Sequence, residues 1–287
     1  MKRISFILFL FLFSSLLLHS ANTRVPEDWF GRVQVPSGSE VEVVKFKTDQ
    51  IVYAGTNGSG LYVSYDAGTG WVKLTGFPED FPCIKDFLIA PNKDLYAATF
   101  GGGVYYSNDN GATWIPKNTG IKNLYVQAIT ISESGKLICG TYGGGIYYSD
   151  DNGDNWIRTD KGLRYDNITC LTTLSNGFIL AGTYGGGFYV SRDTCKTWMV
   201  SNTQLENTFI NDMVKDPAGN VYAATNGAGV MMTGNGIAWR TYNNKFHYKN
   251  NAKVMPILDT ALTSVGANGY QLLMGTRSAG MYFWDDL

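Results

Sequence analysis

The chain has 287 residues, 44% of them hydrophobic, and its 23 Lys and Arg nearly balance its 24 Asp and Glu. This composition predicts a globular protein, and the lack of a basic run argues against nucleic acid as a partner. Two His and four Cys without metal-type spacing predict no metal centre and no cofactor. The 34 Gly and 14% aromatic residues favour short strands joined by tight turns.

Residues 1–21 have the pattern of a secretory signal peptide. Lys2 and Arg3 precede an apolar run from Ile4 to Leu18, and small residues follow up to Ala21. The run is shorter than the roughly 20 residues that a membrane-spanning helix needs, although a retained N-terminal anchor is the alternative. We expect export to the periplasm, the cell surface or the medium, with no stable membrane insertion.

An internal repeat with a period of about 42 residues predicts the architecture. Each unit contains a Thr, a Gly-rich turn, an apolar run and a second turn that ends in Trp. In the third unit, this pattern predicts strands at 126–131, 137–142 and 146–149, and a fourth strand that begins at Trp156. Four strands per unit is typical of a β-propeller blade. The repeated threonines are Thr56, Thr99, Thr141, Thr183, Thr225 and Thr276.

The two ends of the chain predict the number of blades. The last unit stops at Leu287, directly after its third strand, so it lacks a fourth one. Trp29 precedes Val41 by the same interval that separates Trp114 from Val126. We therefore expect an all-β, six-bladed propeller of four-stranded antiparallel blades, formed by residues 22–287 as a single domain. The N-terminal strand is expected to complete the last blade and close the ring.

The turn S-x-D-x-G-x-T-W has a mechanical explanation. Its Asp accepts hydrogen bonds from backbone amides, its Gly supplies a positive φ, and its Trp is buried between sheets. Segments 107–114 and 149–156 resemble the Asp-boxes, or BNR repeats, of sialidases, xyloglucanases, sortilin-type receptors and photosystem-assembly propellers. The resemblance covers residues 29–287 and implies a propeller whose boxes lie away from the ligand face. The Asp position is filled by Asp66, Asp109, Asp151 and Asp193, with Asn235 in the fifth unit.

The resemblance leaves the function open. Sialidases resemble one another in an arginine triad, a Phe-Arg-Ile-Pro segment and a Tyr–Glu pair, and the nearest segment here, 31–36, is a poor match. Glycoside hydrolysis needs two carboxylates about 5–10 Å apart, and Glu42, Asp86 and Asp212 are the candidates. We predict a non-catalytic module, with a glycoside hydrolase as one alternative and an assembly factor for a membrane protein complex as another.

In a propeller, the turn between the second and third strands and the loop between blades share one face. The position after each repeated Thr offers aromatic rings and amides, which suit a sugar ring or an extended peptide. The alternative is that these rings only pack on neighbouring blades. The loops between blades add Phe81, Tyr125, Tyr165, Phe209 and the segment 245–249. The predicted ligand-binding residues are Asn57, Phe100, Tyr142, Tyr184, Asn226 and Arg277.

These positions predict a monomeric, secreted protein- or glycan-binding module. A second ring of polar side chains on the inner strands is expected to line the central channel. Its members are Glu42, Lys85, Gln127, Thr169, Asn211 and Met255. The cysteines Cys83, Cys139, Cys170 and Cys195 are expected to be isolated buried thiols, with a Cys139–Cys170 bridge as the alternative.

Overall fold

The computed structural model of the protein describes residues 40–201, 208–242, 247–248, 262–268, 271–276 and 281–284. The predicted signal peptide, Trp29, Met255 and Arg277 lie outside the described residues, as does most of the segment 245–249. Every regular element within the described residues is a strand, which confirms the all-β prediction.

The strands are short, and those of the third repeat lie within one residue of their predicted bounds. They are β1 (Glu40–Phe46), β2 (Val52–Asn57), β3 (Leu61–Ser64), β4 (Val72–Lys73), β5 (Ile84–Ile89), β6 (Leu95–Thr99), β7 (Gly103–Ser107), β8 (Ile115–Pro116), β9 (Val126–Ile131), β10 (Leu137–Thr141), β11 (Gly145–Ser149), β12 (Ile157–Thr159), β13 (Ile168–Thr173), β14 (Ile179–Thr183), β15 (Phe188–Ser191), β16 (Met199–Val200), β17 (Phe209–Lys215), β18 (Val221–Asn226), β19 (Val230–Thr233), β20 (Arg240–Thr241), β21 (His247–Tyr248), β22 (Leu262–Asn268), β23 (Gln271–Thr276) and β24 (Met281–Trp284).

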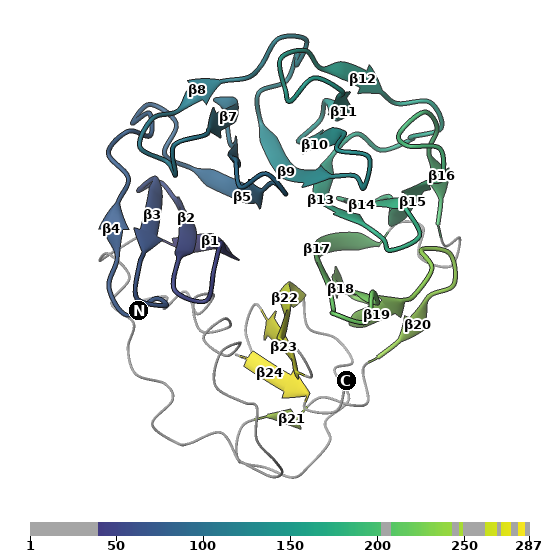
Figure 1. Ribbon diagram of the computed structural model, residues 1–287. Helices are drawn as coiled ribbons and strands as arrows, with labels where there is room; N and C mark the ends of the chain where they lie inside the picture. The colour runs from purple at the N-terminus through teal and green to yellow at the C-terminus, as the bar shows by residue number, and fades with distance from the viewer. Residues whose placement is uncertain are drawn as a thin grey trace.

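The sheets are arranged as the blades of a propeller (Figure 1). Five blades are regular, because each takes four consecutive antiparallel strands in order from the centre outwards, from β1–β4 to β17–β20. The inner strands pack against one another in the order β1, β5, β9, β13, β17 and β22. Among the described residues, no comparable packing joins β22 to β1.

The prediction of a six-bladed ring closed by the N-terminal strand is wrong, because the structure has five blades of the regular kind, not six. The remaining sheet has the order β21-β24-β23-β22. Its outer strand, β21, pairs with β24 but lies upstream of the inner strand β22 in the chain. The segment that follows the fifth blade thus covers the open edge of β24, a role that the sequence pattern assigned to the N-terminus.

Apolar side chains join neighbouring sheets. Tyr53 of the first blade belongs to the same buried cluster as Phe87 and Trp114 of the second, and the Tyr53 and Phe87 rings stack at 5.1 Å. In the first, third and fourth blades, the second strand approaches the next blade closely at a glycine. A Cβ atom on Gly140 would lie 2.3 Å from Cγ2 of Ile168, so only glycine fits at this blade boundary.

The aspartate of the turn between the third and fourth strands accepts a backbone amide, as predicted: Asp151 Oδ1 accepts from the Asn155 amide at 2.9 Å. The serine before it adds bonds that were not predicted. In the third blade, Ser149 Oγ donates to Asp151 Oδ1 at 2.7 Å and accepts from the Gly153 amide at 2.9 Å. Trp156 follows the turn, is buried, and donates from Nε1 to the Lys117 carbonyl of the preceding blade at 2.9 Å. The same Ser–Asp bond occurs at Ser64–Asp66, Ser107–Asp109 and Ser191–Asp193.

All four cysteines are free thiols, and Cys139 and Cys170 are not bridged. The prediction of isolated buried thiols is thus confirmed for three of them and wrong about the burial of Cys83. Cys139, Cys170 and Cys195 are buried, whereas Cys83 is half-buried. Burial raises the pKa of Cys195 to about 12 and also raises the pKa values of Cys139 and Cys170. Because the thiolate is the reactive form, we expect these three thiols to react slowly in the folded chain.

We expect Ser149→Ala to destabilise the protein by about 1–3 kcal/mol, because the buried Gly153 amide loses its acceptor. Ser149 is 1% exposed. Urea unfolding of both proteins measures the difference. The exposed Ser175 provides the matched control, and Ser175→Ala should leave stability unchanged. Equal effects of the two substitutions would contradict the role of the Ser–Asp turn.

Acid should unfold the protein partly through the turn carboxylates. Hydrogen bonds, first from the Thr113 side chain, lower the pKa of Asp109 to about 2, and hydrogen bonds, first from the Asn155 side chain, lower that of Asp151 to about 2. Both folded values lie below the ordinary value of 3.8. Their stabilisation is therefore complete above about pH 4 and is lost as the pH falls towards about 2.

Urea unfolding between pH 5 and pH 2 tests this pH dependence. The double variant Asp109→Asn/Asp151→Asn should show a shallower loss of stability with acid than the parent protein, since neither amide titrates. An unchanged slope would show that these carboxylates do not set the acid sensitivity.

A thiol reagent such as dithionitrobenzoate should label Cys83 alone in the native protein and all four cysteines in denaturant. The reason is that Cys83 is the half-buried thiol of the four. Absorbance counts the released thiolate, and Cys83→Ser should abolish the native signal. Rapid native labelling of a second cysteine would contradict the described packing.

Candidate functional site

We use the term B–C turn for the connection between the second and third strands of a blade, and D–A loop for the connection that leads into the next blade. These segments share one face, the top face, as predicted. A single D–A carbonyl accepts two amides of a B–C turn: Leu124 O from Gly101 (3.0 Å) and Gly103 (2.9 Å). Asp166 O accepts from Gly143 and Gly145 in the same way, at 3.1 and 3.0 Å. Each such carbonyl therefore fixes the turn of the preceding blade.

The predicted binding residues lie on this face wherever the structure describes them. Phe100, Tyr142 and Tyr184 are 38%, 48% and 52% exposed, although each is a large ring next to a buried strand. Asn57 and Asn226 occupy the same position in the first and fifth blades and are also exposed. Arg277, the sixth candidate, lies outside the described residues.

The rings also contact one another. Phe100 lies 4.7 Å from Tyr125 and 6.3 Å from Tyr142 between ring centroids, and Tyr184 lies 4.5 Å from Phe209. The packing alternative is therefore correct in part, but 48% of Tyr125 is exposed as well. We call these five residues the aromatic arc, which spans the second, third and fourth blades and the entry to the fifth.

Two further predicted rings lie against the glycines of the B–C turns. A Cβ atom on Gly102 would lie 2.6 Å from Cγ of Phe81, and one on Gly186 would lie 2.4 Å from Cγ of Tyr165. These contacts explain why the turns are rich in glycine, because any side chain there would displace a ring. Phe81 and Tyr165 therefore help to position the top face.

The repeated threonines form hydrogen bonds within the same turns. Thr141 Oγ1 donates to the Gly145 carbonyl at 2.9 Å, and Thr183 Oγ1 donates to the Gly187 carbonyl at 2.8 Å. Both threonines are fully buried. The sequence analysis used the threonines only to align the repeats, although a buried hydroxyl at every turn is itself a signal of a hydrogen-bonded hairpin.

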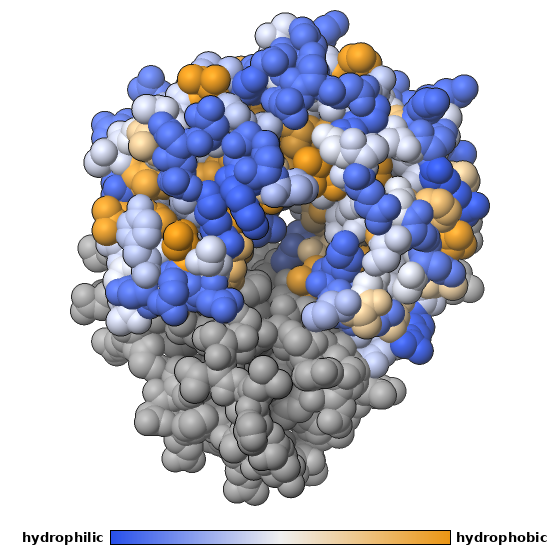
Figure 2. All heavy atoms as spheres, in the orientation of Figure 1, coloured by the Kyte–Doolittle hydropathy of each residue, from blue (hydrophilic) through white to orange (hydrophobic). Residues whose placement is uncertain are grey.

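The inner strands carry the predicted polar ring, and the structure shows what places it there. Every inner strand has a β-bulge, and the bulged residue is the polar one in each blade. In β22 the bulge falls at Thr263, whereas the predicted Met255 lies outside the described residues. Figure 2 shows an opening at the centre of the face it displays, bordered by hydrophilic atoms. The bulged residues are Glu42, Lys85, Gln127, Thr169, Asn211 and Thr263.

The acids considered for catalysis are engaged in structural contacts. Glu42 forms a 2.7 Å ion pair with Lys85 across the first blade boundary. Asp86 accepts from the Ile129 amide of the third blade at 2.9 Å and lies 3.6 Å from Lys45. Asp212 accepts from the amide of the residue that follows it at 2.8 Å. The contacts of Glu42 and Asp86 thus link neighbouring inner strands.

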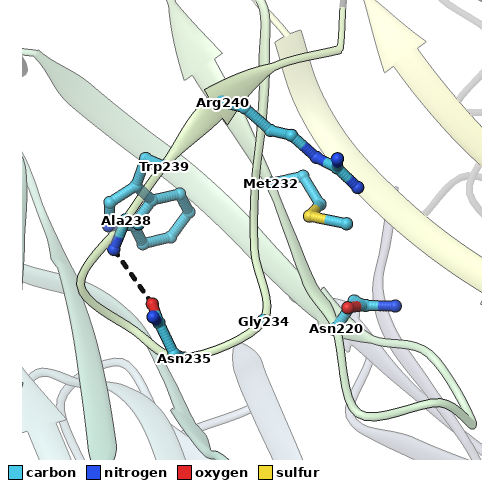
Figure 3. Close-up of a pocket in the computed structure, with 7 residues that line it drawn as sticks. All are labelled: Asn220, Met232, Gly234, Asn235, Ala238, Trp239 and Arg240. Atoms are coloured by element: carbon cyan, nitrogen blue, oxygen red, sulfur yellow. Dashed lines mark hydrogen bonds between the residues drawn. The ribbon is translucent and has the colours of Figure 1, made fainter.

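A shallow pocket of about 360 Å³ lies on the opposite face, at the shortened turn of the fifth blade (Figure 3). Asn235 Oδ1 accepts from the Ala238 amide there at 2.9 Å, and Trp239 stacks on Phe188 at 3.8 Å. The Asn220 amide group is bonded to Asp216. Most polar groups of this pocket are therefore used by the turn itself.

No group of three or more potential metal ligands occurs among the described residues. In the same part of the chain, no helix is long and apolar enough to cross a membrane.

Known structures share the fold of this chain. The extracellular domain of the hybrid two component system BT3049 from B. thetaiotaomicron has a TM-score of 0.69 at 16% identity, over 88% of this chain and 34% of that one. YCF48 bound to D1 peptide has a TM-score of 0.66 at 13% identity, over 89% and 82%. The GH74 xyloglucanase from Xanthomonas campestris has a TM-score of 0.66 at 18% identity, over 88% and 45%.

These identities show a common fold and no more. The chain spans about a third of the length of the two B. thetaiotaomicron extracellular domains that it matches first. No curated protein matches the chain in sequence.

A family model provides the sequence relationship. The model described as the DUF6242 beta propeller domain matches residues 32–178, slightly more than half of the chain. The matched segment includes β1 to β13, and thus the first three blades and the inner strand of the fourth. The chain therefore belongs to the DUF6242 beta propeller domain family.

Proposed function

We propose that this protein is an exported, non-catalytic Asp-box propeller that binds a protein or glycan ligand on its top face. The observation that carries the proposal is the aromatic arc, since it leaves large rings exposed on turns whose backbone is fixed by the next blade. The contact residues are Asn57, Phe100, Tyr142, Tyr184, Asn226 and Arg277.

The fixed backbone favours binding. A ligand that meets a preformed surface does not have to order it, so less of the interaction free energy is lost on association. Aromatic rings add a large contact area while few side-chain rotations are restricted. Binding residues on loops of a rigid scaffold are also the common arrangement in propellers and other repeat folds.

Two observations support export and the Asp-box assignment. The sequence pattern of residues 1–21 predicts a signal peptide, and known structures of similar fold include extracellular and surface domains. The Ser–Asp hydrogen bonds of the third-to-fourth strand turns give the Asp-box resemblance a physical basis.

A second candidate function is that of an assembly factor for a membrane protein complex. The likeness to YCF48 favours it, because the match covers 82% of that chain and thus nearly the whole protein. Such a factor would use the same face to hold a client segment. Affinity purification of the native protein from its own cells tests this role, and recovery of no membrane protein partner would contradict it.

The glycoside hydrolase alternative predicts activity that depends on the channel acids. We expect no turnover on a panel of fluorogenic glycosides, because Glu42 forms an ion pair with Lys85 and Asp86 accepts a hydrogen bond from the backbone of the next blade. Turnover that is lost in Glu42→Gln or Asp212→Asn would overturn the non-catalytic assignment.

Substitutions separate the binding role of the rings from a packing role. Tyr142→Ala and Tyr184→Ala should change the free energy of unfolding by about 0.5 kcal/mol or less, because both rings are half exposed. Trp156→Ala should cost roughly 3–5 kcal/mol, since it leaves a cavity between blades. Chemical denaturation measures all three, and equal effects would show that the tyrosines serve packing alone.

Binding itself is tested on glycan and peptide arrays with the mature chain. Ligands of the top face should be lost in the Tyr142→Ala/Tyr184→Ala double variant and kept in Tyr65→Ala, whose ring is 60% exposed in a turn of the opposite face. If no ligand of either class depends on the two tyrosines, the top face is not the binding surface.

A further inference from the structure

We infer that the ligand of the top face is an extended polypeptide segment that presents apolar and acidic side chains, rather than a carbohydrate. The inference rests on the proposed binding function and specifies its ligand class. Four features of the described residues carry it: the tilt of the rings, the use of the amides beside them, two cations at equivalent positions, and the length of the arc.

The rings of the aromatic arc are tilted against each other. Phe100 and Tyr125 meet at 54° and Tyr184 and Phe209 at 60°, with centroids 4.7 and 4.5 Å apart. The planes of the two rings in each pair are thus inclined, so the pair does not present one flat plate. Branched or aromatic side chains can pack against such inclined rings, whereas a sugar ring stacks on a flat, open aromatic face.

Amide side chains beside the arc are already used by the backbone. Asn123 donates to the Tyr142 carbonyl at 2.9 Å and accepts from the Tyr125 amide at 2.9 Å. Asn118 accepts from the Val104 amide at 2.8 Å and donates to the Gly102 carbonyl at 2.9 Å. A sugar that recruited these amides for its hydroxyl groups would have to release the turns that hold the rings.

Two cations flank the arc at equivalent places in the repeat. Lys122 and Arg164 each occupy the same position of a D–A loop, one residue before Asn123 and Tyr165, and both are exposed. Neither forms a salt bridge within the described residues, whereas the nearby Lys85 is paired with an acid. The exposed acids Asp80 and Asp166 lie in D–A loops of the same face, but neither pairs with these cations. The two unpaired cations beside the rings complement a segment in which acidic and apolar side chains alternate.

The aromatic arc also extends along the circumference of the propeller. Its rings come from three consecutive blades and from the first residue of β17 in the fifth, so a ligand that meets all of them crosses several blade boundaries. An extended chain advances about 3.3 Å per residue and places alternate side chains on one side. It can therefore lay apolar side chains between the rings while intervening acidic side chains reach the cations.

The test measures how tightly four probes bind to the mature protein. Three are fluorescein-labelled peptides, and the fourth is an unlabelled oligosaccharide. The first is a nine-residue peptide with leucine at alternate positions and aspartate or serine between them. The second has lysine in place of aspartate, and the third has serine in place of leucine. Cellohexaose is the carbohydrate probe, measured by calorimetry, and fluorescence anisotropy reports the peptides.

The leucine–aspartate peptide should bind the wild-type protein at least about tenfold more tightly than the other three probes. Tyr142→Ala/Tyr184→Ala should weaken that binding by about tenfold or more, and Tyr65→Ala should leave it unchanged. Lys122→Glu/Arg164→Glu should reverse the order of the two charged peptides, because it reverses the charge beside the arc.

The contrary outcomes separate the two proposals. If cellohexaose binds and is lost in the tyrosine variant, the inference is wrong but the proposed binding face stands. If the leucine–aspartate peptide binds equally well to the tyrosine variant, both are wrong. If none of the four probes binds the wild-type protein, the inference about ligand class is overturned.

Discussion

The hydrogen bonds that one backbone carbonyl makes to the turn of the preceding blade hold the top face of this protein together. The acceptors are the carbonyls of Pro82, Leu124, Asp166 and Thr208, which receive the amides of Gly60, Gly103, Gly145 and Gly187 at 2.9–3.0 Å. These bonds hold each turn through its backbone, so the turn does not depend on which side chain follows the repeated threonine. The positions after the repeated threonines can therefore differ from blade to blade, and Asn, Phe and Tyr all occur there.

The repeat predicted what each blade does by itself. The strands of the third unit, the Ser–Asp turn and the shared face of the B–C turns all follow from local chemistry that recurs every 42 residues or so: a hydroxyl, a carboxylate and glycines at fixed spacing. The exposure of Tyr142 did not follow from the sequence, since a ring that packs and a ring that faces solvent look the same in a repeat.

The sequence failed where the repeat is interrupted. The connection after Trp239 is longer than the others, and no tryptophan marks the two-residue strand β21. The interval from Trp29 to Val41 matched the repeat, so we assigned the outer strand of the last sheet to the N-terminus. The spacing of a repeat does not determine which segment of the chain pairs with a free sheet edge. The polar ring was predicted as far as β17 because the bulges follow the repeat up to that strand. The last bulge lies at Thr263, beyond the longer connection, so the spacing of the repeat pointed to Met255 instead.

The position of β21 has a consequence for how the chain folds. Since each sheet, including the last, is assembled from a continuous stretch of sequence, no sheet has to wait for the two ends of the polypeptide to meet. Sequence-local pairing lowers the contact order and the entropy lost in closing long loops. The sheets can thus form one after another during synthesis, and each can pack against the exposed face of the sheet that formed before it.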